Sequence, residues 1–237
     1  TGGILEGDLE DAIINVNQDA VLDFDGTNDY ITVADHADLD FGTGSSTITA
    51  WAYADHSGSQ KLIVSKHNAK LDNNAGYLMR AGANAAFTAR VSNGSGYVTG
   101  SDGDNITTGW HHFAMVIDQS ANRLYRYVDG ELQGTATVIS ASYNTDNNEV
   151  MQIGRRLDTG GDGSETGNWF DGRIADVRVY KGEALSQANI QVLASKINAN
   201  KNLGAGTTNL KLHLPLVLKD STATVNETID ADEVDNN

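Results

Sequence analysis

The chain has 237 residues, of which 32 are acidic and 16 are basic, so its formal net charge is −16 with neutral histidines. This excess of negative charge would repel a phosphate backbone, which excludes nucleic acid as an expected partner. No apolar run approaches the ~18 residues of a membrane span, and the absence of cysteine excludes a disulfide framework. With 25 glycines and one proline, the composition favours many short strands joined by tight turns over a helical bundle.

The chain begins with an acidic segment, residues 1–19, which we expect to be an arm or an edge strand. From residue 20 the order AVLDF, DGTND and YITVAD has the apolar-turn-apolar spacing of an antiparallel hairpin. Further β-type runs, each bounded by Gly, Asn, Asp or Ser, lie at 46–53, 61–66, 76–80, 86–91, 109–118, 122–132, 135–140, 149–156 and 171–180. Strands of this length and spacing predict two packed antiparallel sheets, and they exclude parallel winding with crossover helices.

The run from Trp110 to Asp118 is predicted to be a central strand, because alternate side chains are apolar on both of its faces. The pair Asp129-Gly130 predicts a two-residue hairpin turn soon after it. His111 and His112 are adjacent and therefore point to opposite faces of a strand. Joint zinc ligation by these two side chains is excluded for that reason.

One helix is predicted within residues 184–200, with Ser186 as its N-cap and an apolar face that would pack on the sandwich and close it. The stretch 202–209 then has the composition of a linker. The run LKLHLPLVLK is predicted to be a strand at an edge or a bulge, because proline cannot donate a ladder hydrogen bond. We therefore divide the chain into an acidic arm at 1–19, one β-sandwich domain at 20–200, and a linker, edge strand and acidic tail at 201–237.

Four blocks of this domain together resemble the laminin-G-like, concanavalin A-like lectin/glucanase superfamily, and their order and spacing match that family as well as their wording. The blocks are 22–33, 46–53, 109–132 and 153–186. The resemblance implies an all-β fold, a two-sheet antiparallel jelly-roll sandwich with one short C-terminal helix and extended terminal arms. It does not fix a ligand, because this fold serves lectins, glycosidases, adhesion modules and virion proteins.

The resemblance also implies a structural Ca²⁺ where the first long strand meets the last one. The matching residues in this chain are Asp25, Gly26, Asn28, Asp29 and Asp176. A turn of this composition offers carboxylate and carbonyl oxygens at close quarters, and Ca²⁺ takes about six to eight oxygen ligands. The alternative is that Asp25 and Asp29 only hold the turn, through hydrogen bonds from their side chains to the backbone.

Two further acidic loops, 158–165 and 101–105, each precede a tryptophan and are candidates for a ligand site, because binding residues often lie on loops held by a rigid scaffold. Trp169 or Tyr143 would stack on a sugar ring. The polar residues that would bind its hydroxyl groups are Asp162, Glu165 and Asn168. The alternatives are that both loops are solvated acidic turns and that Trp169 is a core residue at the start of a strand.

A catalytic role is also considered, because the superfamily includes laminarinase-type glycosidases with a Glu-x-Asp-x-Glu signature. The segment Glu6-Gly7-Asp8-Leu9-Glu10 has this spacing, which would place three carboxylates on one strand face. The segment lies in the N-terminal arm, however, whereas those enzymes carry the signature on a strand in the middle of the chain. We therefore expect no catalytic residues and no enzyme activity.

The sequence leaves two functions open for an extracellular, cell-surface or virion-surface protein. The first is a non-catalytic, calcium-stabilised module that binds a glycan or a protein on a cell surface. The second is a structural subunit of a virion or an extracellular filament, in which the jelly roll is the scaffold and the termini contact copies of the chain or neighbouring subunits. A glycosidase is a third and weaker hypothesis.

Overall fold

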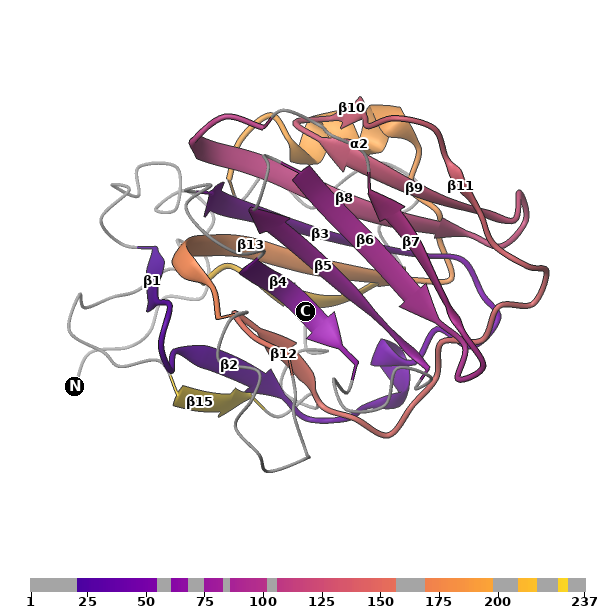
Figure 1. Ribbon diagram of the computed structural model, residues 1–237, viewed down its shortest axis with the longest axis horizontal. Helices are drawn as coiled ribbons and strands as arrows, with labels where there is room; N and C mark the ends of the chain where they lie inside the picture. The colour runs from indigo at the N-terminus through magenta and orange to yellow at the C-terminus, as the bar shows by residue number, and fades with distance from the viewer. Residues whose placement is uncertain are drawn as a thin grey trace, which may run out of the picture.

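Two sheets packed face to face form a jelly-roll sandwich, as the resemblance implies (Figure 1). The computed structural model describes residues 21–54, 61–67, 75–82, 86–101, 106–156, 169–197, 209–216 and 226–229. The strands expected between residues 21 and 181 are present, and no crossover helix joins them among the residues that the structure describes. A short 3-10 helix, η3 (Ala37–Leu39), lies between the second and third strands.

The first sheet has eight strands, and six of them follow one another in the order β1-β13-β3-β8-β9-β10. Strand β11 pairs with β9, and β14 pairs with β13. The bounds of these strands are β1 Leu22–Asp25, β3 Ser46–Ala54, β8 Gly109–Asp118, β9 Arg123–Val128, β10 Glu131–Leu132, β11 Thr137–Val138, β13 Asp171–Lys181 and β14 Leu210–Leu214.

The second sheet has seven strands in the order β15-β2-β12-β4-β5-β6-β7. The bounds of its strands are β2 Tyr30–Val33, β4 Lys61–Lys66, β5 Gly76–Gly82, β6 Ala86–Ser92, β7 Tyr97–Ser101, β12 Met151–Ile153 and β15 Asn226–Ile229. In Figure 1, strands β4 to β7 cross the front of the molecule, so the outer face of this sheet is turned toward the viewer.

The core lies between the two sheets and is built from the inward side chains of both. On β8, Phe113, Met115 and Ile117 point into this core, while Ala114 and Val116 belong to a second buried cluster on the outer side. The two-faced apolar pattern of this strand is therefore confirmed. The Asp129-Gly130 turn is also confirmed, because both residues have the positive φ values, 51° and 81°, that a tight hairpin turn uses.

Helix α2 (Gln187–Leu193) packs against part of the outer face of the eight-stranded sheet. Ser186 is its N-cap, as predicted, and its side chain accepts a hydrogen bond from the backbone N–H of Asn189 at 3.3 Å. Ile190 and Leu193 are buried against Tyr127 and Tyr180 in the second cluster. Within the part of the chain that the structure describes, no helix is long and apolar enough to cross a membrane.

The C-terminal strands complete the sandwich of their own chain. Strand β14 pairs antiparallel with β13, directly beyond β1 on the same edge, and Leu22 N–H donates to the carbonyl of Leu216. Strand β15 pairs parallel with β2, which is an exception to the otherwise antiparallel pairing that was expected. The sheets therefore extend past the boundary at residue 200, because these strands fill edges that would otherwise be open.

Candidate functional site

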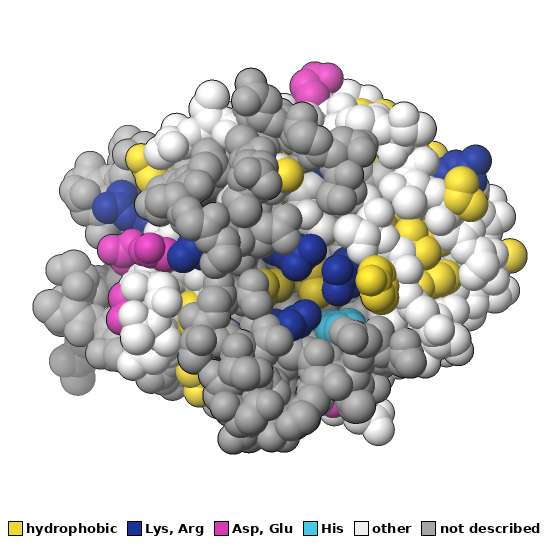
Figure 2. Space-filling model, viewed as in Figure 1, with side chains coloured by type: hydrophobic (Ala, Val, Ile, Leu, Met, Phe, Trp, Pro, Cys, Tyr) yellow, Lys and Arg dark blue, Asp and Glu magenta, His cyan; other side chains and the backbone are white. Residues whose placement is uncertain are grey.

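The outer face of the seven-stranded sheet carries polar and charged side chains in a regular pattern. Side chains alternate along each strand, so Tyr77 and Met79 of β5 point into the core while Leu78 and Arg80 point outward. On β6, Thr88 and Arg90 lie on the same outward face, directly opposite Arg80 and Leu78 respectively. In Figure 2, Lys and Arg side chains gather near the middle of this face, beside hydrophobic side chains.

Three arginines, Arg80, Arg90 and Arg156, form what we call the arginine cluster. Arg80 and Arg90 are diagonal neighbours across β5 and β6, which places their Cα atoms roughly 7–8 Å apart. Burial, together with the smaller effect of the positive charges of Arg90 and Arg156, lowers the pKa of Arg80 to about 10. The chain thus concentrates positive charge at one point of an otherwise strongly acidic protein.

Arg90 is held in place by strand β7. Its Nε donates to the hydroxyl of Thr99 at 3.1 Å, and its guanidinium lies 4.3 Å from the centroid of the Tyr97 ring. The Tyr97 side chain is itself 53% exposed, so the edge of this face presents an aromatic ring to solvent. A fixed guanidinium beside an exposed ring is suited to bind a ligand that has both a polar and an apolar side.

A fourth arginine, Arg155, lies against two neighbouring aromatic rings, and we call this group the Arg155 stack. Its guanidinium is 3.4 Å from the centroid of the Tyr30 ring and 5.2 Å from that of Trp169. Its Nε donates to the side-chain oxygen of Gln152 at 3.0 Å. Trp169, which comes just before β13 of the other sheet, is thus placed beside Arg155 and Tyr30, and Tyr30 lies on β2 of the sheet that carries the arginine cluster. It is partly buried rather than a core residue.

The turn between β1 and β2 contains four of the predicted calcium ligands. The Asp25 carboxylate accepts hydrogen bonds from the N–H groups of Thr27 at 2.7 Å and Asn28 at 3.1 Å, and these bonds lower its pKa. The Asp29 carboxylate accepts from the N–H of Asp25 at 3.0 Å. Gly26 has a φ of +75°, and a Cβ at this position would lie 2.9 Å from the Cβ of Asp171. The side chains therefore form the hydrogen bonds that hold the turn, and Ca²⁺ binding by the same residues stays a prediction.

Asp176, the fifth predicted ligand, does not join this turn. Strand β1 pairs with residues 171–174 of β13, and Asp176 lies farther along that strand, at a bulge where its φ is +51°. Arg178 donates to both of its carboxylate oxygens, at 2.7 and 3.1 Å, and His213 lies 2.8 Å from one of them. Burial raises the pKa of Asp176, but the bonds and charges of His213 and Arg178 outweigh this, so the pKa is lowered overall.

The metal set is therefore split, because Asp176 neutralises a buried arginine instead of facing the turn. Without it, the turn retains the carboxylates of Asp25 and Asp29, with Asp171 alongside Gly26. This is only part of the about six to eight oxygen ligands that Ca²⁺ needs. Across the described residues, no three His, Asp or Glu side chains come together as a metal site.

Tyr143, predicted to stack on a sugar, is a core residue. Its side chain is only 4% exposed, and its hydroxyl donates to the carbonyls of Val91 at 3.3 Å and Gly96 at 3.0 Å. The three polar residues predicted to act with it, Asp162, Glu165 and Asn168, lie outside the described residues, and so does the Glu6 to Glu10 segment. We call the outer face of the seven-stranded sheet, with the arginine cluster and Arg155, the arginine face. Among the predicted ligand-binding residues that the structure describes, Trp169 lies beside Arg155 of this face and Tyr143 lies in the core.

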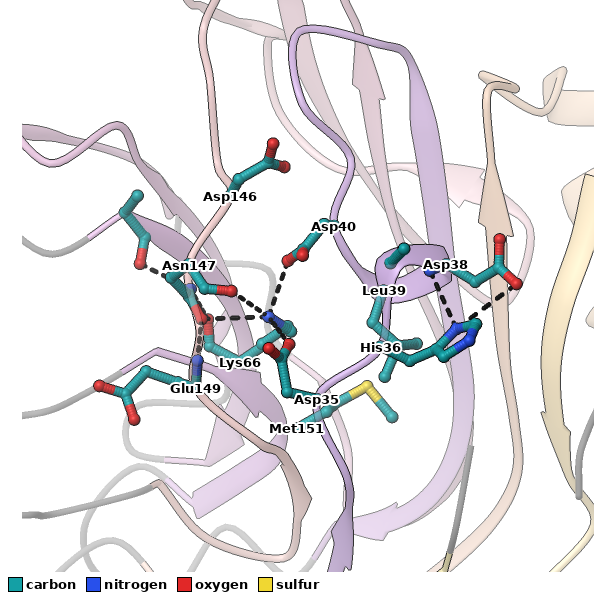
Figure 3. A network of polar contacts seen from close by, with 12 residues as sticks. Asp35, His36, Asp38, Leu39, Asp40, Lys66, Asp146, Asn147, Glu149 and Met151 are labelled. Carbon is teal, nitrogen blue, oxygen red and sulfur yellow. Dashed lines mark hydrogen bonds and ion pairs between the residues drawn. The ribbon is translucent and has the colours of Figure 1, made fainter. Parts of the chain in front are cut away.

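A buried cation with four oxygen partners, Lys66, belongs to a different network (Figure 3). Its side chain is fully buried, and its Nζ lies 2.9 Å from a carboxylate oxygen of Asp35 and 2.8 Å from one of Asp40. The same Nζ donates to the backbone oxygen of Asn147 at 2.7 Å and to its side-chain oxygen at 3.1 Å. Lys66 therefore fastens the segments on either side of η3 to the segment before β12, which is a structural role.

Comparison with known proteins identifies the fold family. A family model described as "Concanavalin A-like lectin/glucanases superfamily" matches residues 25–191. A search of curated proteins found no match. Among solved structures, the chain is similar to the heptameric SAP-like pentraxin of Limulus polyphemus, with 21% identity over 76% of this chain and 84% of that chain and a TM-score of 0.56.

Two carbohydrate-binding proteins are also similar to the chain. One is the CBM40 of the IT-sialidase of Ruminococcus gnavus, with 13% identity over 74% of this chain and 97% of that one and a TM-score of 0.55. The other is a putative carbohydrate-binding protein from Bacteroides ovatus, with 18% identity, 83% coverage of this chain and a TM-score of 0.58. The aligned region spans about half, 52%, of the Bacteroides protein. At these identities the likeness shows the shared fold.

Proposed function

The chain belongs to the concanavalin A-like lectin/glucanase superfamily, and from this premise we propose that it is a non-catalytic glycan-binding module. The observation that carries the proposal is the outer face of the seven-stranded sheet, where the arginine cluster, the Arg155 stack and the exposed Tyr97 ring lie together on one sheet. On the other sheet, part of the outer face is covered by α2. The similarity of the chain to carbohydrate-binding proteins adds support.

The chemistry of this face suits a sugar. A pyranose has an apolar C–H face and a rim of hydroxyl groups, so it binds where a ring and several polar groups point the same way. Tyr97 supplies an exposed ring, and Arg90 beside it supplies N–H donors whose position Thr99 fixes. Arg155 and Trp169 supply a second pairing of a guanidinium with a ring.

A glycan array with the full chain tests this function. We expect retention on a restricted set of glycans, and we expect Tyr97→Ala to weaken it about tenfold because the stacking ring is lost. Val138→Ala is a matched control, since Val138 is 63% exposed on β11 of the other sheet. Mass spectrometry of the bound glycan should recover it intact. The absence of any retained glycan, or hydrolysis of the bound one, would overturn the proposal.

We also propose that Ca²⁺ stabilises the module at the turn between β1 and β2. The low pKa of Asp25 keeps its carboxylate ionised, and Asp29 and Asp171 lie at the same turn. If this part of the proposal is right, millimolar Ca²⁺ should raise the melting temperature, EDTA should reverse the shift, and Asp29→Asn should abolish it. An identical melting temperature with Ca²⁺ and with EDTA would limit Asp25 and Asp29 to holding the turn.

We place the module outside the cell, on a surface or in a secreted protein, where glycans are accessible. The alternative function, a structural subunit of a virion or filament, draws its support from the termini. An assembly would share these terminal strands between chains. Here, β14 and β15 instead pair with β13 and β2 of their own chain. Light scattering tests the alternative, because a structural subunit is expected to form a defined oligomer and a monomer would contradict that role.

A further inference from the structure

We propose that the ligand of the arginine face carries a negatively charged group, a carboxylate or a sulfate ester on a sugar, and that Arg80 binds this group. The inference rests on the proposed glycan-binding function and names the class of glycan. It is carried by the position of Arg80 among other arginines, by the lack of a partner for it in the described chain, and by the neighbouring groups that would hold a sugar ring.

The first step is geometric. The strand register places Arg80 opposite Thr88 on β6 and opposite Leu62 on β4, with Arg90 diagonal to it. Arg156 approaches from the segment after β12, and its charge, like that of Arg90, acts on the Arg80 guanidinium. The sheet therefore holds three guanidinium groups together at its outer surface.

The second step concerns counter-charge. Ion pairs among the described residues neutralise Lys66, Arg178 and other cations. Arg80 forms no ion pair or hydrogen bond with any described residue, and its Nε is buried without an acceptor. A chain with twice as many acidic as basic residues could pair this arginine easily. A partly buried, unpaired cation beside two like charges is costly for the fold, so it indicates a binding role.

The third step identifies the ligand. A guanidinium presents a planar fork of N–H donors that matches the oxygens of a carboxylate or a sulfate, and such charge-assisted bonds are stronger than those to a neutral hydroxyl. Partial burial strengthens the attraction further, because the local dielectric constant is lower than in water. Arg90 and the exposed Tyr97 ring lie next along the same face, where they would hold the sugar that carries the charge.

Isothermal titration calorimetry with three matched sugars tests the inference: lactose, α2,3-sialyllactose, which adds a carboxylate, and lactose 3′-sulfate, which adds a sulfate ester. We expect one or both charged sugars to bind at least about tenfold more tightly than lactose. Raising the salt concentration should weaken the charged sugars and leave lactose almost unchanged. The two charged sugars separate a carboxylate ligand from a sulfated one.

Variants then assign the effect to one residue. Arg80→Met should weaken binding of the charged sugar about tenfold or more, and Arg80→Lys should fall in between, because it keeps the charge but loses the fork. Arg173→Met is the matched control. Arg173 lies on β13 of the other sheet, where its side chain is 38% exposed and 3.8 Å from Asp23. Circular dichroism confirms that each variant is folded.

The outcomes separate this inference from the proposed function. If lactose binds as tightly as both charged sugars, or if Arg80→Met binds the charged sugar like the unmodified chain, the inference is overturned while glycan binding stands. If no sugar binds here or on the array, glycan binding is overturned, and with it the class of glycan named above. Tight binding of a charged sugar that depends on Arg80 supports both.

Discussion

Lys66 and Arg80 lie on strands β4 and β5, which are hydrogen-bonded neighbours in the same sheet, yet the fold treats the two cations in opposite ways. Lys66 is fully buried and surrounded by oxygens, two from carboxylates and two from Asn147. Arg80 is partly buried, and among the described residues the charges that shift its pKa are those of two other arginines. One positive charge is neutralised within the molecule, and the other lacks a neutralising group among the described residues.

This difference shows how a structural cation is distinguished from a binding one. Burying a charge is unfavourable unless oxygens replace its lost hydration, which is the arrangement around Lys66. Where such oxygens are missing, the buried charge lowers the stability of the fold. We infer that such a charge is kept because another molecule supplies the oxygens. Replacing each cation with an uncharged side chain of similar length should therefore change the stability of the fold in opposite directions.

The largest effect is expected for Lys66→Met. Removing the ammonium leaves Asp35, Asp40 and the Asn147 oxygens without their common donor. The free energy of unfolding should fall by about 3 kcal/mol, the lower end of the range for breaking a buried ion pair, because both carboxylates retain some exposure to water. Urea denaturation followed by tryptophan fluorescence measures the change.

Lys61→Met is the control for this variant. Lys61 lies on the same strand, but its Nζ is 3.9 Å from Asp171, whose side chain is 51% exposed, so the loss should be about 1 kcal/mol or less. Adding Asp40→Asn to Lys66→Met should recover part of the lost stability, because one of the uncompensated charges is then removed. Equal losses for Lys61→Met and Lys66→Met would contradict the structural role of Lys66.

The next largest effect concerns His112, a base that the fold keeps neutral. Its side chain is 1% exposed beside Trp51, and burial lowers its pKa to about 4, with Arg178 opposing protonation and Asp176 and Asp129 favouring it. In the unfolded chain the pKa is near 6.5, so between these values the unfolded state binds a proton that the folded state does not.

The stability that His112 contributes is therefore complete above pH 6.5 and is lost as the pH falls from 6.5 toward 4, by up to about 3 kcal/mol. His112→Phe keeps a ring against Trp51 and cannot take up the proton. Urea denaturation at pH 7 and at pH 4.5 should show a smaller acid loss in this variant than in the unmodified chain. The same loss in both would mean that His112 is protonated inside the fold.

Local rules predicted most of the fold from the sequence. The two-faced β8 strand, the Asp129-Gly130 turn and the Ser186 N-cap each depend on neighbouring residues, and each is confirmed. The pairing between segments that are distant in the chain is harder to predict from the sequence. Asp176 was assigned to the calcium set by its position in a motif, whereas the strand register places it next to Pro215 and His213.

The candidate site was mostly missed for the same reason. Arg80 and Arg90 each occur once in a short strand-like run, ten residues apart, and only the register of β5 and β6 makes them neighbours. The available signal was weak: each arginine interrupts a largely apolar run, at a position that strand alternation turns away from the core. Trp169 is predicted as a binding residue because it follows an acidic loop and its ring could stack on a sugar, but its contact with Arg155 depends on the folded chain.

A smaller effect is expected for Arg155→Met, because Arg155 has partners that are not carboxylates. The variant loses the contacts with the Tyr30 and Trp169 rings and the bond to Gln152, so the free energy of unfolding should fall by about 1 kcal/mol. Arg173→Met, with its loose surface ion pair, should change it by less. If the two variants are equally stable, the aromatic contacts of Arg155 contribute nothing to the fold.

The smallest change, and the one of opposite sign, is expected for Arg80→Met. The variant removes a partly buried charge that is repelled by Arg90 and Arg156, so the free energy of unfolding should stay constant or rise by about 1 kcal/mol. Sodium sulfate offers the complementary measurement, with sodium chloride at equal ionic strength as the control. Sulfate should stabilise the unmodified chain more than the variant, because an anion bound to the folded state favours that state.

A loss of stability as large as that of Lys66→Met would show that Arg80 has a structural partner, and its assignment to a ligand would fail. A gain in the free energy of unfolding would show that the charge of Arg80 destabilises the fold. Since Met preserves the apolar contacts of the arginine stem, the change in stability isolates the charged group. The combination of a more stable variant and a weaker complex with the charged sugar is the signature of a residue retained for binding.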